Sequence, residues 1–292
     1  MDRMQPQATI QNARNEADAL RAVRQASVRT RTARAESQER RAILTRTVEI
    51  AVIPELLELH RAPLAVSQTP ALVVEAVDVA RLVNLVLAHD EPAALAFVSS
   101  MHDRGAAHET LCLDLLAPTA RRLGEMWESD DCDFTEVSIG LWRLQAALRA
   151  LGDVSQAAGV RPVGARVLLV PLPGEQHTFG LSMVHDFFVR AGWDSWTGPV
   201  ESSAELATMV RSHWVAMLGF SLACDEQLDA VRAEIRRVRS ASCNPDIAIM
   251  VGGPGFSADP TLAGQVGADG TATDGRQAVL QAALLVTNGM RR

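Results

Sequence analysis

The sequence contains no tyrosine and no lysine, and aromatic residues make up only 4% of its 292 positions. Cysteine is also scarce, and no two of the four cysteines have the CxxC spacing of common zinc and redox motifs. This usage is typical of a reducing cytoplasm, where structural disulfides are rare. We expect Cys132, which lies in a polar stretch, to be the most exposed thiol. The four are Cys112, Cys132, Cys224 and Cys243.

Long apolar runs and a signal peptide are absent as well, so the sequence predicts a soluble cytoplasmic protein with no membrane partner. The net charge of −7 argues against a surface that binds nucleic acid throughout. The charge is uneven, because residues 1–46 hold ten arginines against five acidic residues. The basic N-terminal arm, residues 1–42, is either a frayed extension or a segment that touches DNA or an acidic partner.

Composition and periodicity divide the chain into four segments. Residues 1–42 form the basic arm, partly disordered or helical. Residues 43–152 repeat apolar side chains at helical spacing, with prolines and polar turns between them, which predicts a bundle of four or five helices; a kink is expected at Pro118. Residues 153–164 are a plausible linker, and residues 165–292 form the last segment.

In the last segment short apolar runs alternate with amphipathic helical stretches. This alternation predicts a doubly wound, five-stranded parallel sheet of the flavodoxin-like kind, so the fold class is α + α/β. The expected strands are 165–171, 193–196, 214–221, 246–251 and 270–272.

Polar and glycine residues follow these strands, at the edge where such sheets bind ligands. His177 and Glu175 lie in the loop after the first strand, and a helix follows near Gly180. The Glu175 carboxylate can accept a proton from one ring nitrogen of His177 and leave the other for a metal. Ser221 ends the third strand, Gly252-Gly253 follow the fourth, and Asp274 follows the fifth.

The motifs that are missing narrow the ligand. No GxGxxG follows the first strand and no phosphate-binding P-loop is present, so a dinucleotide or a nucleoside triphosphate has no support. His177 has no cysteine near it in sequence, and His185 lies in the following helix, which argues against an ordinary zinc site there. A single axial histidine suits a metal that a macrocycle already holds.

Trp127 ends a helix of the bundle, just before the polar turn at Asp130. A tryptophan in this position either presents its ring to a ligand outside the bundle or packs in the core. Asp133 or Thr135 can cap the next helix.

These residues together show a family resemblance. Glu175-x-His177-x-x-Gly180, then Ser221, then Gly252-Gly253 resembles the cobalamin-binding motif Asp-x-His-x-x-Gly, Ser-x-Leu, Gly-Gly. The helical segment with Trp127 resembles the cap module of methionine synthase and CarH-type photoreceptors. From about residue 43 onward the sequence is most similar to AerR/PpaA-type cobalamin-binding antirepressors.

The resemblance implies cobalamin (vitamin B12, as adenosylcobalamin or hydroxocobalamin) with His177 as the lower axial cobalt ligand. It implies that Trp127 covers the upper face and that a slot for the nucleotide tail is lined by Gly180, Ser221, Leu222, Gly252 and Gly253. Two departures stand out: Glu175 occupies the usual aspartate position, and Leu222 follows Ser221 directly.

The function implied is transcription regulation in photosynthesis, by a photoreceptor that is not an enzyme. Its expected partner is a PpsR/CrtJ-type repressor, with DNA reached through that partner or weakly through the basic arm. Two alternatives remain open: a corrinoid carrier subunit for methyl transfer, and a haem-binding redox sensor that uses the same histidine.

Overall fold

A computed structural model of the protein describes residues 72–88, 90–155, 165–173, 175, 177–222 and 227–289. They all belong to one compact unit, Thr47–Arg292. The basic arm 1–42, the first expected helix and the segment 156–164 lie outside the described residues. The last helix of the bundle continues to Ser155, three residues into the expected linker. Within the described part no helix is long and apolar enough to span a bilayer.

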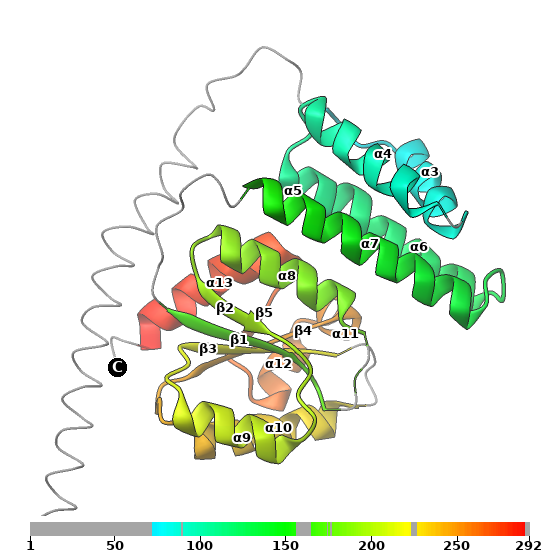
Figure 1. The fold of residues 1–292 in the computed structure, drawn as a ribbon. Helices are drawn as coiled ribbons and strands as arrows, with labels where there is room; N and C mark the ends of the chain where they lie inside the picture. The colour runs from blue at the N-terminus through cyan, green and yellow to red at the C-terminus, as the bar shows by residue number, and fades with distance from the viewer. Residues whose placement is uncertain are drawn as a thin grey trace, which may run out of the picture. The chain divides into compact units, whose positions relative to one another are not determined.

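The N-terminal part is helical, as expected (Figure 1). Its helices pack on one another, with α3 and α4 against α7 and with α6 against α3 and α7. The elements are α3 (Ala76–Leu87), α4 (Glu91–Asp103), α5 (His108–Thr110), the π-helical segment η2 (Leu111–Leu116), α6 (Ala117–Glu128) and α7 (Phe134–Ser155).

Short side-chain caps set where these helices begin. The backbone N–H of Ala93 donates to the Asp90 carboxylate at the start of α4. At the start of α7 the N–H of Glu136 donates to Asp133 Oδ1, and the N–H of Asp133 donates to Glu136 Oε2, both at 2.8 Å. This reciprocal capping box satisfies two backbone donors that the helix itself leaves unpaired. Of the two expected caps, Asp133 is therefore the one used.

The expected interruption at Pro118 takes a different form. Helices α5, η2 and α6 follow one another without a break, and Pro118 lies in the first turn of α6. Because proline has no backbone N–H, it cannot donate to the carbonyl four residues earlier. The N–H of Ala117 donates instead to the carbonyl of Cys112, five residues back, and this is the bond of a π turn.

Two cysteines differ in exposure from what the sequence indicates. Cys132 is buried and Cys243 is exposed, so the prediction that Cys132 is the most exposed thiol was wrong. The N–H groups of Asp131 and Cys132 both donate to the Met126 carbonyl, which folds this polar turn back against α6. A polar stretch can therefore still bury a single small side chain.

The C-terminal part contains one sheet of five parallel strands in the order β2-β1-β3-β4-β5 (Figure 1). This is the flavodoxin-like order of a doubly wound fold, and it confirms the predicted fold class. The strands are β1 (Arg166–Pro171), β2 (Asp194–Thr197), β3 (Met217–Ser221), β4 (Ala248–Gly252) and β5 (Gly270–Thr271).

Helices cover both faces of this sheet. Helices α8 and α13 pack together, and the buried side chains of α9, α10 and α12 form one core with β1, β3 and β4. Helix α8, which was expected to begin near Gly180, begins at Phe179, so Gly180 lies inside it. The helices are α8 (Phe179–Arg190), α9 (Ser203–Ser212), α10 (Leu228–Ala241), α11 (Pro254–Ala258), α12 (Thr261–Val266) and α13 (Gly275–Gly289).

Candidate cofactor site at the carboxyl edge of the sheet

The strand order places a topological switch point between β1 and β3. The chain leaves β1 toward β2 on one side and leaves β3 toward β4 on the other, so their following loops diverge. Pro171, Ser221 and Gly252 are in register across β1, β3 and β4, which aligns the ends of these strands. In open α/β sheets the crevice at such a point is where ligands bind.

His177 lies in the loop between β1 and α8, and its ring is held by Glu175. The Nδ1 atom lies 2.5 Å from Glu175 Oε1, and the backbone N–H of His177 donates to the same oxygen at 2.9 Å. The Glu175 side chain is only 5% exposed, whereas the imidazole is 66% exposed. A carboxylate on Nδ1 leaves Nε2 as the nitrogen that can bind a metal. The loop thus presents an oriented, accessible imidazole.

The other histidine close by in sequence, His185, takes no part in this loop. Its Nδ1 atom lies 2.9 Å from the Ser195 hydroxyl of β2. Burial lowers the pKa of His185 below its ordinary value, which favours the neutral ring. The structure therefore separates the two histidines, since His185 contacts β2 and His177 lies in the loop after β1.

Two glycines leave open space around the strand ends. A Cβ atom built on Gly180 or Gly252 meets nothing within 4 Å in the described residues. Gly253 is different, because its φ of 133° is unfavourable for other residues and a Cβ there would lie 1.8 Å from the Leu222 carbonyl oxygen. Gly253 therefore keeps the chain close to the end of β3, and Gly180 and Gly252 leave room for a ligand.

One residue at this edge was missed by sequence reasoning. Thr271 ends β5 and is in register with Val251 of β4. Its Oγ1 atom is buried and has no hydrogen-bond partner among the described residues, and such a hydroxyl usually pairs with a ligand or water. The sequence alone does not single out Thr271, because its position opposite Val251 follows from the pairing of β4 with β5. Asp274, which the sequence places at the same edge, caps α13 by accepting from the Gln277 N–H at 2.8 Å.

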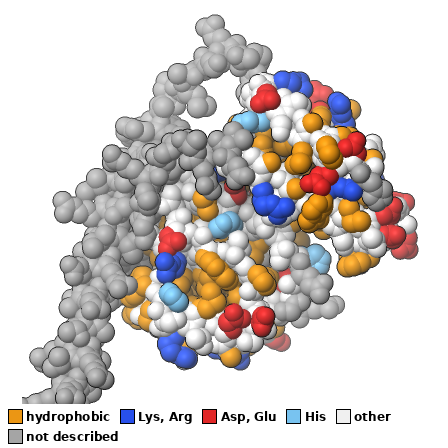
Figure 2. All heavy atoms as spheres, viewed as in Figure 1, with side chains coloured by type: hydrophobic (Ala, Val, Ile, Leu, Met, Phe, Trp, Pro, Cys, Tyr) orange, Lys and Arg blue, Asp and Glu red, His pale blue; other side chains and the backbone are white. Residues whose placement is uncertain are grey.

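Trp127 is in the last turn of α6 and is 48% exposed, so it is not a core tryptophan. Phe134 and Trp142 of α7 are also exposed large hydrophobic residues, and α6 packs on α7. Figure 2 shows hydrophobic side chains at the surface of the bundle. The hairpin of α6 and α7 therefore carries exposed aromatic rings of the kind that cover a flat ligand.

The structure brings together only part of the predicted set. Ser221 and Gly252 are direct neighbours on β3 and β4, and the Leu222 N–H donates to the Gly252 carbonyl at 3.0 Å. Leu222 is buried in the sheet core, so its side chain is a packing group in this conformation. Trp127 belongs to the bundle, and the described residues show no hydrogen bond from its ring to the strand ends.

Comparison with known proteins shows the class of cofactor. Residues 165–281 match a model described as a B12 binding domain, and residues 79–151 match a second model with the same description. The residues at the sheet edge fit that group. Among the described residues, His177 has no hydrogen-bond partner at Nε2, Gly180 and Gly252 leave space, and Thr271 has a hydroxyl without a hydrogen bond.

One curated relative is the "uncharacterized 20.5 kDa protein in bchF-crtJ intergenic region" of Rhodobacter capsulatus. It is 41% identical over 83 residues, which are 27% of this chain and 43% of the relative. The match thus spans less than half of the relative's length.

Among solved structures, the Methanosarcina barkeri monomethylamine corrinoid protein has the same fold, with a TM-score of 0.58 and 12% identity. The likeness covers 71% of this chain and 96% of that one. The solved structure shows the fold, and the two family models support a cobalamin-binding protein.

Proposed function

We propose that the protein is a cobalamin-dependent, light-responsive transcription regulator of the AerR/PpaA type, not an enzyme. It acts as an antirepressor by binding a PpsR/CrtJ-type repressor of photosynthesis genes. The observation that carries the cobalamin part is the His177 imidazole, oriented by Glu175 and exposed at the switch point. The regulatory part is supported by the relative, whose printed name places it beside crtJ.

The residues of the chain have separable roles in this proposal. Glu175 fixes the His177 ring through Nδ1, so that Nε2 would be the atom that holds the cobalt. Gly180 and Gly252 leave space for the displaced nucleotide tail, and Ser221 and Thr271 offer it hydroxyls. When bound, cobalamin would supply a cobalt–carbon bond that light can break. Trp127 would cover the opposite face and transmit the change to the bundle.

The first test is an absorption spectrum of the purified protein with adenosylcobalamin or hydroxocobalamin, in the dark and after illumination. We expect wild type to retain corrinoid, to show histidine ligation of the cobalt, and to change its spectrum on illumination. His177→Ala should lose the signature of histidine ligation. His213→Ala is the matched control, because His213 is also exposed but lies at the end of α9.

Each other outcome has a clear meaning. If the protein retains corrinoid but its spectrum does not change on illumination, the photoreceptor role is contradicted and a corrinoid carrier is favoured. Methyl transfer to a partner enzyme is then the next assay. A haem spectrum in place of corrinoid would favour the redox sensor. If His213→Ala alters the spectrum as much as His177→Ala does, the assigned ligand is wrong.

The antirepressor role needs a separate measurement. We expect the corrinoid-loaded protein to bind a PpsR/CrtJ-type repressor with an affinity that differs between dark and illuminated samples. Equal affinity for the repressor in the dark, in the light and in the apo-protein would contradict the antirepressor role. It would not affect the conclusion on cobalamin binding.

A further inference from the structure

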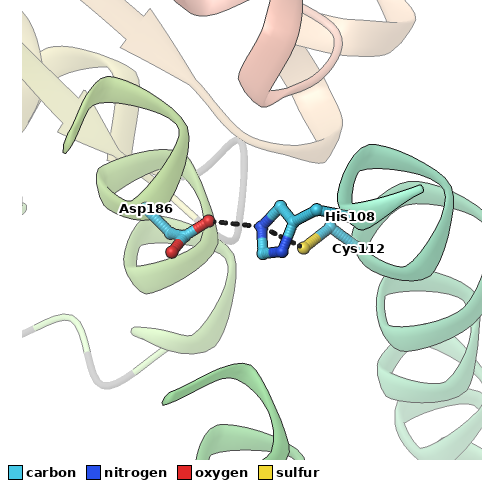
Figure 3. Close-up of side chains that lie close together, drawn as sticks. All are labelled: His108, Cys112 and Asp186. Carbon is cyan, nitrogen blue, oxygen red and sulfur yellow. Dashed lines mark hydrogen bonds and ion pairs between the residues drawn. The ribbon is translucent and has the colours of Figure 1, made fainter. Parts of the chain in front are cut away.

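Outside the sheet edge, three side chains that carry metal-ligand chemistry meet between the bundle and the sheet part. His108 and Cys112 come from α5 and η2, and Asp186 comes from α8 (Figure 3). The four-residue spacing puts His108 and Cys112 on one helical face. Their ligand atoms and that of Asp186 all lie within 4.8 Å of one another.

His108 contacts both Asp186 and Cys112 through the same ring nitrogen. His108 Nε2 lies 2.6 Å from Asp186 Oδ2 and 3.2 Å from Cys112 Sγ. In a catalytic triad the nucleophile contacts one nitrogen of the histidine ring and the carboxylate contacts the other. The three residues here therefore do not form such a triad. One nitrogen can donate one proton or accept one, and so it cannot make both bonds at full strength. A cation at this point would engage all three groups at once.

The three groups also match one class of cation in type and charge. Thiolate, imidazole and carboxylate are the ligands that zinc uses in proteins. A thiolate and a carboxylate carry two negative charges; the Arg190 guanidinium, 2.8 Å from Asp186 Oδ2, offsets one of them, and a divalent cation can compensate the other. Cys112 is 0% exposed, while His108 and Asp186 are 12% and 15% exposed at their side chains. The cluster is thus nearly dry but can be reached from solvent.

We propose that His108, Cys112 and Asp186 bind one zinc ion, with water as the fourth ligand, and that this ion joins α5 and η2 to α8. The ligand distances of zinc place neighbouring ligand atoms about 3.3 to 3.7 Å apart in a tetrahedral site. The observed separations of 2.6 and 3.2 Å therefore have to open by about 1 Å or less. Side-chain rotation on two neighbouring helices can provide this.

Hydrogen bonds from Arg190 orient the Asp186 carboxylate as a zinc ligand. Arg190 donates from Nε to Asp186 Oδ2 at 2.8 Å and from its NH2 group to the Leu151 carbonyl at 2.9 Å. A ligand carboxylate that is itself hydrogen-bonded is the usual second layer of a metal site.

The test uses the full-length, untagged protein without corrinoid, because cobalamin carries its own cobalt. After treatment with a chelator, the protein is titrated with Co²⁺ as a spectroscopic probe. We expect one Co²⁺ per chain, a thiolate-to-cobalt charge-transfer band, and displacement by Zn²⁺. Cys112→Ser should abolish the charge-transfer band, whereas Cys243→Ser, which changes an exposed cysteine, should keep it.

A nearly isosteric change separates ligation from folding. Asp186→Asn should weaken Zn²⁺ binding, measured against a chromophoric chelator, by more than about tenfold. Zn²⁺ should raise the thermal midpoint of wild type but raise that of Asp186→Asn less. Circular dichroism checks that both proteins are folded. Failure of wild type to bind Co²⁺ or Zn²⁺, or a charge-transfer band that survives Cys112→Ser, would mean a hydrogen-bonded network only and would overturn the proposal.

Discussion

At the scale of single residues, two kinds of glycine stand side by side at the candidate site. Gly253 is required by the backbone, since its φ is 133° and a Cβ would collide with the Leu222 carbonyl. Gly180 and Gly252 have no such constraint in the described residues, and the open space beside them can take part of a ligand. The sequence shows all three as glycine and cannot distinguish the roles.

Substitution by alanine should separate these roles. Gly253→Ala should lower the free energy of unfolding by about 2 kcal/mol or more, because it adds backbone strain and a collision. Gly180→Ala lies near the start of α8 and should leave stability unchanged or raise it by up to about 1 kcal/mol. Urea unfolding of the apo-proteins measures both. A Gly253→Ala protein as stable as wild type would contradict the backbone role.

At the scale of elements, the alternation of short apolar runs and helices predicted all five strands to within a few residues. Parallel strands that are buried on both faces appear as continuous apolar runs, and these are easy to detect. The π turn before Pro118 and the short helix α11 were not predicted, because local hydrogen bonding selects them. The contact of His108 with Asp186 joins residues 78 positions apart and has no local signal.

The candidate site was predicted to a similar extent. The sequence predicted the loop of His177 and its partner Glu175, because a glutamate and a histidine closely follow an apolar strand. Thr271 could not be found, because its position opposite Val251 at the end of β4 depends on which strands pair. The alternative positions of Trp127, in the core or at the surface, needed the packing of α6 on α7 to be resolved.

The capping box of α7 provides a test at this scale. Asp133→Ala removes the side-chain acceptor of the Glu136 N–H. We expect a loss of about 1 kcal/mol in the free energy of unfolding, since α7 packs against α3, α4 and α6. Thermal and urea unfolding measure it. Glu128→Ala, at the exposed end of α6, is the control; an equal loss there would show that the cap is not the cause.

At the scale of the whole molecule, the burial of its thiols can report how the fold opens. Cys112 is 0% exposed, and Cys243 is exposed. In chelator-treated protein without denaturant, an alkylating reagent should modify Cys243 quickly and Cys112 only at the rate at which the bundle opens. Peptide mass spectrometry after timed quenching distinguishes the sites. Equally fast modification of both would mean that the bundle is open much of the time.

The two outer strands of the sheet are unusually short. Strand β2 has four residues and β5 has two, while the inner strands β1, β3 and β4 have five or six. The unpaired N–H and C=O groups of a long, flat outer strand are what a second chain uses to extend a sheet. In the described part of the chain, the outer strands present few such groups along either side of the sheet. Pairing of outer strands between two molecules therefore has few backbone groups to use.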